Sequence, residues 1–162
     1  MTREKREELL SIEFPMELEY QWAAGPNLQR FFEELKEGTI IGNRCPQCKR
    51  ILIPPVNVCG RCHVEMGDVV KLSPKGTVIS YNFVVDPLFD SALGAMRPVP
   101  YTSVAIVLDG NPTATFSHIL DESDPHKVTV GMRVEAVFKP PSERKGLISD
   151  IIHFRPLSDG EK

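Results

Sequence analysis

All four cysteines of this 162-residue chain fall in two closely spaced pairs. The first pair is Cys45 and Cys48, and the second pair, Cys59 and Cys62, follows after ten intervening residues. Two C-x-x-C pairs at hairpin distance are typical of one tetrahedral Zn²⁺ held by four thiolates, with sulfur–metal distances of about 2.3 Å. Four protein thiolates leave no coordination position for water or substrate, so we expect a structural zinc ion.

Three other uses of these cysteines are compatible with parts of the pattern. A thioredoxin-like site needs one C-x-x-C beside a βαβ unit, and the sequence has no such unit. Residues 59–63 match the C-x-x-C-H pattern of haem c attachment, which leaves Cys45 and Cys48 without a role. Two disulfides require an oxidising compartment. The spacing favours zinc over all three.

The ten residues between the pairs are enough for two short strands and a reversal, which predicts a zinc ribbon. Strands at 39–44 and 68–72 are expected to enter and leave it. Pro54 and Pro55 cannot donate to a sheet ladder, so they belong on an edge or in a bulge.

A short amphipathic helix is predicted immediately before the ribbon. Asn27 can cap its start, and Gly38 stands where a C′ glycine belongs. A helix this short is marginal alone, so its apolar stripe must pack on the ribbon or barrel, or else meet a ligand or partner. The stripe comprises Leu28, Phe31, Phe32 and Leu35.

Period-two alternation follows the ribbon and predicts five strands, at 77–85, 102–108, 112–120, 131–139 and 147–155. A polar segment at 121–129 has room for a helical turn between the third and fourth strands, which is the order of an OB-fold barrel. A generic five-stranded barrel or half-sandwich is the alternative. The expected fold is therefore mainly β. The first strand is expected to turn one face inward, with Ile79, Tyr81, Phe83 and Val85 on it.

The chain divides into a helical arm (1–38), the ribbon (39–75), the OB-fold domain (76–157) and a tail (158–162). The arm carries 5 basic and 9 acidic side chains, the ribbon 6 and 2, and the remainder 8 and 11, so only the ribbon is basic. The composition, with 41% hydrophobic and 25% charged residues, is that of a globular protein. We recognise no secretory signal and no apolar run long enough to cross a bilayer. We therefore expect a cytoplasmic location without membrane attachment.

The sequence contains no pattern that points to catalysis by this chain alone. Nucleophile elbows, Gly-rich phosphate loops and H-E-x-x-H motifs are absent, and the four histidines are scattered. A long connection at 86–100 is more apolar than an idle loop needs, and we interpret it as a lid or partner-contacting loop.

Several short motifs occur together in one arrangement: residues 31–38, 44–48, 54–55, 59–62, 76–81, 100–101, 131–134 and 154–156. In this the chain resembles the acyl-CoA-associated family that has an N-terminal helix, a rubredoxin-like zinc ribbon and a C-terminal OB-fold. The resemblance departs at Lys49 and His63, where a glycine commonly follows each knuckle.

The resemblance implies a non-catalytic subunit that encloses acyl-CoA together with a thiolase-like partner, either a thiolase, a hydroxymethylglutaryl-CoA synthase or an aldolase. The pathway would be CoA-thioester, lipid or aromatic-acid metabolism, and the partner would supply the reactive groups. Candidate cations for a CoA phosphate are Arg44, Lys49, Arg50, Arg61 and Arg97. Candidate partner or lid contacts are Trp22, Phe31, Phe32, Phe89 and Met96.

Zinc ribbons and OB-folds also bind nucleic acids, so a single-strand binder is the alternative function. Such proteins use a basic groove lined with stacking aromatic residues. The predicted barrel is acidic instead, and Tyr81 and Phe83 are expected in its core. Nucleic-acid binding is therefore the less favoured hypothesis.

Overall fold

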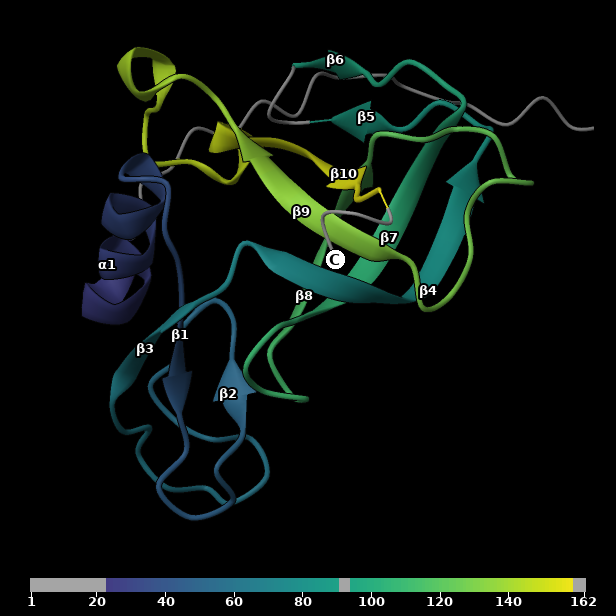
Figure 1. Ribbon diagram of the computed structural model, residues 1–162. Helices are drawn as coiled ribbons and strands as arrows, with labels where there is room; N and C mark the ends of the chain where they lie inside the picture. Colours follow the sequence, from purple (N-terminus) through teal and green to yellow (C-terminus); the bar gives the residue numbers. More distant parts are fainter. Residues whose placement is uncertain (1–22, 91–93, 159–162) are drawn as a thin grey trace, which may run out of the picture.

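A computed structural model describes residues 23–90 and 94–158 (Figure 1). A helix, α1 (Gly25–Lys36), leads into a three-stranded ribbon of β1 (Ile40–Arg44), β2 (Ile51–Leu52) and β3 (Val69–Leu72). The barrel strands are β4 (Lys75–Val84), β7 (Tyr101–Leu108), β8 (Thr115–Leu120), β9 (Arg133–Phe138) and β10 (Ile151–Pro156). A small hairpin, β5 (Phe89–Asp90) and β6 (Ala95–Met96), and two 3₁₀ turns, η1 (Pro141–Glu143) and η2 (Ile148–Asp150), complete the described chain.

Helix α1 begins three residues earlier than the sequence predicts. Pro26 occupies its first turn, where a missing N–H does no harm, and no side chain caps the start. The predicted cap at Asn27 is therefore wrong: its Nδ2 donates instead to the Val56 carbonyl (3.2 Å) and to Asn57 Oδ1 (2.7 Å) in the ribbon. The C′ glycine is confirmed, because Gly38 has a φ of 78° and its N–H donates to a carbonyl of the last turn.

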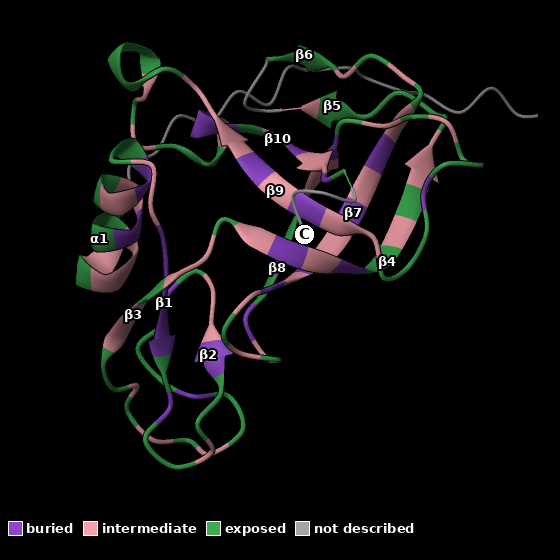
Figure 2. Cartoon of the chain, in the orientation of Figure 1, coloured by how far each residue is buried: buried purple, intermediate pink, exposed green. Residues whose placement is uncertain are grey.

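Part of the apolar stripe of α1 packs within the protein, which is the first of the two roles expected for it. Phe31 and Leu35 have 0% exposure, and the helix lies against β1 and η2. Figure 2 shows buried positions on α1 and on the neighbouring β1. The helix thus joins the ribbon to the end of the barrel.

The ribbon sheet has the order β2-β1-β3, with both pairings antiparallel. Pro54 and Pro55 lie outside the strands, as their missing N–H groups require. The strands that enter and leave the ribbon are confirmed within one residue of the predicted bounds. Between the cysteine pairs the structure has one strand, β2, and an isolated bridge at Val58 in place of the two expected strands.

The five barrel strands close in the order β10-β8-β7-β4-β9. Strand β10 completes the closure by pairing parallel with β8, with Phe154 opposite Leu120. This is the OB-fold topology predicted from the strand order. The connector at 121–132 contains turns and no helix, so the expected helical turn is wrong, and the last strand starts at Ile151 because η2 occupies the residues before it.

Strand β4 departs from simple alternation because its pairing with β7 shifts between Val78 and Ser80. This bulge turns Ile79 outward, so that 46% of it is exposed, and Val85 beyond the strand is 68% exposed. The prediction that both face inward is therefore wrong, although Tyr81 and Phe83 do pack against the core. Among the described residues, no helix is long and apolar enough to cross a membrane.

Candidate metal centre and neighbouring surfaces

Each cysteine pair sits in a tight knuckle with the same backbone pattern. In the first knuckle, Lys49 N donates to the Cys45 carbonyl (3.0 Å) and Cys45 N donates to the Arg50 carbonyl (2.8 Å). In the second, His63 N and Cys59 N make the equivalent bonds, at 2.8 and 2.9 Å. Lys49 and His63 take positive φ values of 61° and 54°, so the two positions without the usual glycine still adopt the left-handed turn.

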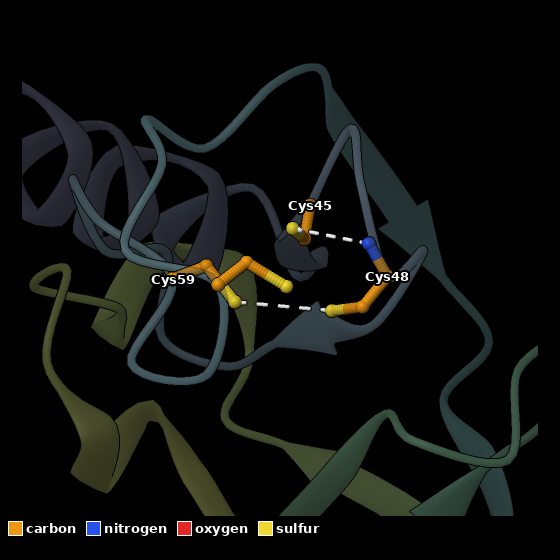
Figure 3. A group of neighbouring side chains, drawn as sticks. Cys45, Cys48 and Cys59 are labelled. Carbon is orange, nitrogen blue, oxygen red and sulfur yellow. Dashed lines mark hydrogen bonds between the residues drawn. The ribbon is translucent and has the colours of Figure 1, made fainter.

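The four sulfur atoms converge on one point. They all lie within 4.8 Å of one another, and Cys48 Sγ is 3.8 Å from Cys59 Sγ. A tetrahedron of sulfurs about 2.3 Å from zinc has edges of about 3.8 Å, so this spacing fits the ion. Figure 3 shows the Cys45, Cys48 and Cys59 sulfurs facing a common centre, with the Cys48 N–H donating to Cys45 Sγ at 3.4 Å.

The electrostatics of this cluster keep its thiols protonated until a cation binds. Without one, burial and the neighbouring thiols raise the pKa of Cys62 to about 12. Four thiolates packed this closely repel one another, and a divalent ion removes that repulsion. Because all four donors are protein sulfurs, the ion stabilises the fold and offers no open position for chemistry.

Asn43 supports the ribbon in a way that the sequence analysis missed. Its side chain is 1% exposed and makes two bonds to Val56, from Nδ2 to the carbonyl (2.6 Å) and from the Val56 N–H to Oδ1 (3.2 Å). Pro54 and Pro55 prevent a regular strand pairing here, and the Asn43 side-chain amide binds the Val56 backbone in its place. These two bonds attach the segment before the second knuckle to β1. A polar residue inside β1, one glycine after its two isoleucines, was the available signal.

The five candidate CoA-phosphate cations do not form one cluster. Four of them, Arg44, Lys49, Arg50 and Arg61, are exposed on the ribbon. Arg97 follows β6, and Figure 1 shows the β5–β6 hairpin and the ribbon at opposite ends of the molecule. Arg97 is also paired with Asp90 and lies over the Tyr101 ring, 5.6 Å from its centroid.

The candidate partner contacts that the structure describes do not form one cluster either. Phe31 is wholly buried, so its prediction as a contact is wrong: it belongs to the core. Phe32 is partly exposed and lines a hollow beside α1. Phe89 and Met96 are 67% and 55% exposed on the hairpin. Trp22 lies outside the described residues.

The described histidines do not assemble a catalytic group. Burial lowers the pKa of His118 and keeps it neutral, and its ring stacks on Phe116. His153 lies 3.6 Å from Asp121 at the surface. Within the described ranges, the four cysteines are the only cluster of metal-binding side chains.

Comparisons with known proteins agree with this arrangement. A family profile described as the ChsH2 rubredoxin-like zinc ribbon domain matches residues 32–67, and one described as the ChsH2 C-terminal OB-fold domain matches residues 69–139. A DUF35 domain-containing scaffold protein of Methanocaldococcus jannaschii is 31% identical over 134 residues, which are 80% of this chain and 91% of the relative. The chain belongs to the DUF35 family. Its zinc ribbon and OB-fold are those of that family.

Two solved structures share the DUF35 fold. The structure described as the Ltp2-ChsH2(DUF35) aldolase aligns with a TM-score of 0.59 at 22% identity, over 84% of this chain and 98% of the other. A DUF35 protein of unknown function from Sulfolobus solfataricus aligns with a TM-score of 0.55 at 22% identity, over 82% and 84%. At this identity the likeness concerns the fold.

Proposed function

We propose that this DUF35 protein is a non-catalytic, zinc-binding subunit that encloses acyl-CoA together with a thiolase-like enzyme in the cytoplasm. The observation that carries the proposal is the pairing of a ribbon with an OB-fold barrel in the arrangement of the Ltp2-ChsH2(DUF35) aldolase structure. The name of the M. jannaschii relative, a scaffold protein, agrees with a role without catalysis.

The chemistry of the described residues supports this division of labour. The four cysteines fill the coordination sphere of a metal, so none is available as a nucleophile. In such a complex the partner supplies the reacting groups. This chain contributes surface that positions the thioester and excludes water, which raises the rate without new chemistry.

Two exposed surfaces are proposed for these contacts. The hairpin presents Phe89 and Met96, which are large apolar side chains of the kind that anchor interfaces. Phe32 presents a further partly exposed ring beside α1. The four ribbon cations suit a CoA phosphate better than Arg97 does, because Asp90 already offsets the charge of Arg97.

The alternative, nucleic-acid binding, receives less support from the barrel. A single-strand groove needs unpaired basic side chains along the backbone path. Two barrel arginines instead bind carboxylates, Arg133 with Asp109 and Arg155 with Glu135, and Arg97 beside the hairpin binds Asp90.

Affinity purification of the tagged chain from its native cytosol at low salt tests the proposal. We expect a thiolase-like protein in a fixed stoichiometry, identified by mass spectrometry. The double variant Phe89→Ser/Met96→Ser should lose it, whereas Val130→Ser, which alters another exposed apolar side chain, should retain it. Recovery of the chain alone, or with an unrelated protein, would refute the proposal.

A further inference from the structure

The turn between β7 and β8 begins with Asp109 and Gly110, a dipeptide that is chemically labile. The nitrogen of a glycine that follows an aspartate can attack the side-chain carboxyl carbon, because glycine has no Cβ to hinder the approach. The sequence contains two such dipeptides, at 109–110 and at 159–160. The Asp109 side chain is 41% exposed and Gly110 is exposed, so water reaches this bond.

The structure fixes both residues of this dipeptide. Gly110 has a φ of 99°, a conformation that strains a residue with a Cβ. Asp109 is the partner of Arg133, whose two terminal nitrogens donate to the two carboxylate oxygens at 2.7 and 2.6 Å. A substitution that removed the labile dipeptide would therefore strain the turn or break the ion pair.

The same ion pair restrains the reaction. Ring closure joins the Gly110 nitrogen to Asp109 Cγ and expels one carboxylate oxygen as water, which requires the neutral acid. Both oxygens accept hydrogen bonds from the guanidinium, and Nη1 also donates to Thr77 Oγ1 at 3.0 Å, which holds the guanidinium in place. The hydrogen bonds from Arg133 favour the carboxylate and lower the pKa of Asp109. The ring can therefore close only after this fork has opened.

The turn also connects the barrel to the zinc ribbon. Thr113 Oγ1 accepts the N–H of Ile51 in β2 at 2.9 Å. Asn111 Oδ1 holds Thr113 in position, because it accepts the Thr113 N–H at 2.9 Å and the Thr113 hydroxyl at 2.5 Å. Figure 1 shows this turn beside β2. A change in the backbone at 109–110 therefore acts on a contact that orients the ribbon on the barrel.

We propose that Asp109–Gly110 is a site of spontaneous isoaspartate formation and that Arg133 protects it. A bond forms between the Gly110 nitrogen and Asp109 Cγ and one water molecule leaves, which gives a succinimide ring. Hydrolysis of the new bond restores aspartate. Hydrolysis of the bond between the Asp109 main-chain carbonyl carbon and the Gly110 nitrogen leaves isoaspartate, and water is the only other reactant. Isoaspartate has one more carbon in its main chain and a shorter carboxylate side chain, so the fork to Arg133 is lost.

Ageing of the full, zinc-loaded chain at pH 7 tests the proposal, with peptide mapping by mass spectrometry to measure isoaspartate at position 109. Arg133→Met should raise the rate of formation at least about threefold over wild type, and Arg133→Lys, which keeps the charge without the fork, should lie between them. The same chain unfolded in urea gives the rate without protection, and wild type should be slower than that.

Two controls separate protection from general stability. Glu135→Gln removes the partner of Arg155 from the strand that begins with Arg133 and leaves the fork intact, so this variant should react at the wild-type rate. The dipeptide at 159–160 is an internal standard, and its rate should not respond to Arg133→Met.

Hydrogen exchange tests the effect on the ribbon. Isomerised Arg133→Met, separated by chromatography from the unreacted variant, should show reduced protection of the Ile51 amide. The amides that pair β1 with β3 should keep their protection, because they lie within the ribbon. Unchanged protection of Ile51 would overturn the connection to the ribbon.

Three results would overturn the protective role of Arg133. These are equal rates in wild type and Arg133→Met, a wild-type rate equal to that of the unfolded chain, and the same acceleration in Glu135→Gln as in Arg133→Met. All these measurements use the chain without a partner. Purification without a thiolase-like protein would therefore refute the proposed function and leave this inference unchanged.

Discussion

Arg133 and Asp109 are joined by two parallel hydrogen bonds, from Nη1 to Oδ1 at 2.7 Å and from Nη2 to Oδ2 at 2.6 Å. Nη1 also donates to Thr77 Oγ1 at 3.0 Å. Arg133 begins β9, Asp109 follows β7 and Thr77 lies in β4, so one guanidinium links three neighbouring segments of the barrel. The hydrogen bonds from Arg133 hold the pKa of Asp109 below its ordinary value.

Arg133→Lys should destabilise the barrel modestly. A lysine cannot reproduce the forked geometry, but the Asp109 side chain is 41% exposed, so water screens the pair and the loss should be about 1 kcal/mol. Urea denaturation at pH 7 measures it. Arg30→Lys on the exposed side of α1 is the control and should change the free energy of unfolding little. A loss of equal size in both variants would show that the fork adds nothing.

Cys45→Ser should remove the metal and the fold of the ribbon together. The binding energy of a structural zinc is about 10–16 kcal/mol in small zinc domains, and it is available only when all four ligands are present. Metal analysis should show one zinc per wild-type chain and far less in the variant, with loss of amide-exchange protection in β1–β3. Gln47→Ser, an exposed change within the same knuckle, should keep the zinc. A fully protected ribbon without metal would contradict the prediction.

His63→Gly should stabilise the protein by about 0.5–1 kcal/mol. His63 has a φ of 54°, and a left-handed conformation costs a residue with a Cβ about 1–2 kcal/mol, partly offset by the entropy of glycine. Lys49→Gly should gain less, because Lys49 Nζ donates to the Pro46 carbonyl at 2.6 Å. Thermal unfolding of the zinc-loaded forms compares them, with Arg61→Gly as the control. A lower melting temperature for His63→Gly would contradict the strain argument.

Asp150→Asn should destabilise the loop that supports α1. The carboxylate has 0% exposure and accepts the N–H groups of Lys145, Gly146 and Leu147 at 2.6–3.1 Å. Burial alone would raise the pKa of Asp150, but these donors and the charge of Lys139 outweigh it, so the pKa lies below the ordinary 3.8. Loss of the charge should cost about 3 kcal/mol at pH 7.

The pH dependence has a definite sign. Because the folded-state pKa of Asp150 is depressed, its stabilisation is complete above the ordinary value of 3.8 and is lost as pH falls through the lower folded-state value. The difference in the free energy of unfolding between wild type and Asp150→Asn should therefore be smaller at pH 3 than at pH 7. Asp121→Asn, at an exposed carboxylate, is the control. A difference that persists unchanged at low pH would contradict this account.

Phe31→Ala and Phe32→Ala should differ strongly although the residues are adjacent. Phe31 is fully buried between α1 and the core, so its truncation should cost about 3–5 kcal/mol. Phe32 is partly exposed, and about 1 kcal/mol is expected. Guanidinium unfolding measures both. Similar losses would show that Phe32 is also a core residue.

The features that the sequence predicted well follow from spacing and periodicity. The cysteine pairs, the C′ glycine at Gly38 and the order of the barrel strands each have a local signature. The division of the chain at residues 38, 75 and 157 stays a prediction, and so do the contacts with CoA and a partner.

The features that were missed depend on tertiary pairing. The bulge after Val78 turns the side chain of Ile79 to the outer face of the barrel. An alternating sequence does not indicate where the pairing with a neighbouring strand shifts register. Asn27 looked like a cap because its side chain suits one, but the ribbon supplied better acceptors. The role of Asn43 likewise appears only when Val56 is placed beside it.

The single parallel pairing of β10 with β8 also sets an order of assembly. All strands of the ribbon lie between Ile40 and Leu72, so its contacts are local in sequence. The ribbon can therefore form around its metal while later segments are still being synthesised. The barrel cannot close until Phe154 reaches Leu120, and β8 keeps an unpaired edge until then. A nascent chain of this protein would therefore carry a finished ribbon and an open barrel, and the open edge is where a chaperone would be needed.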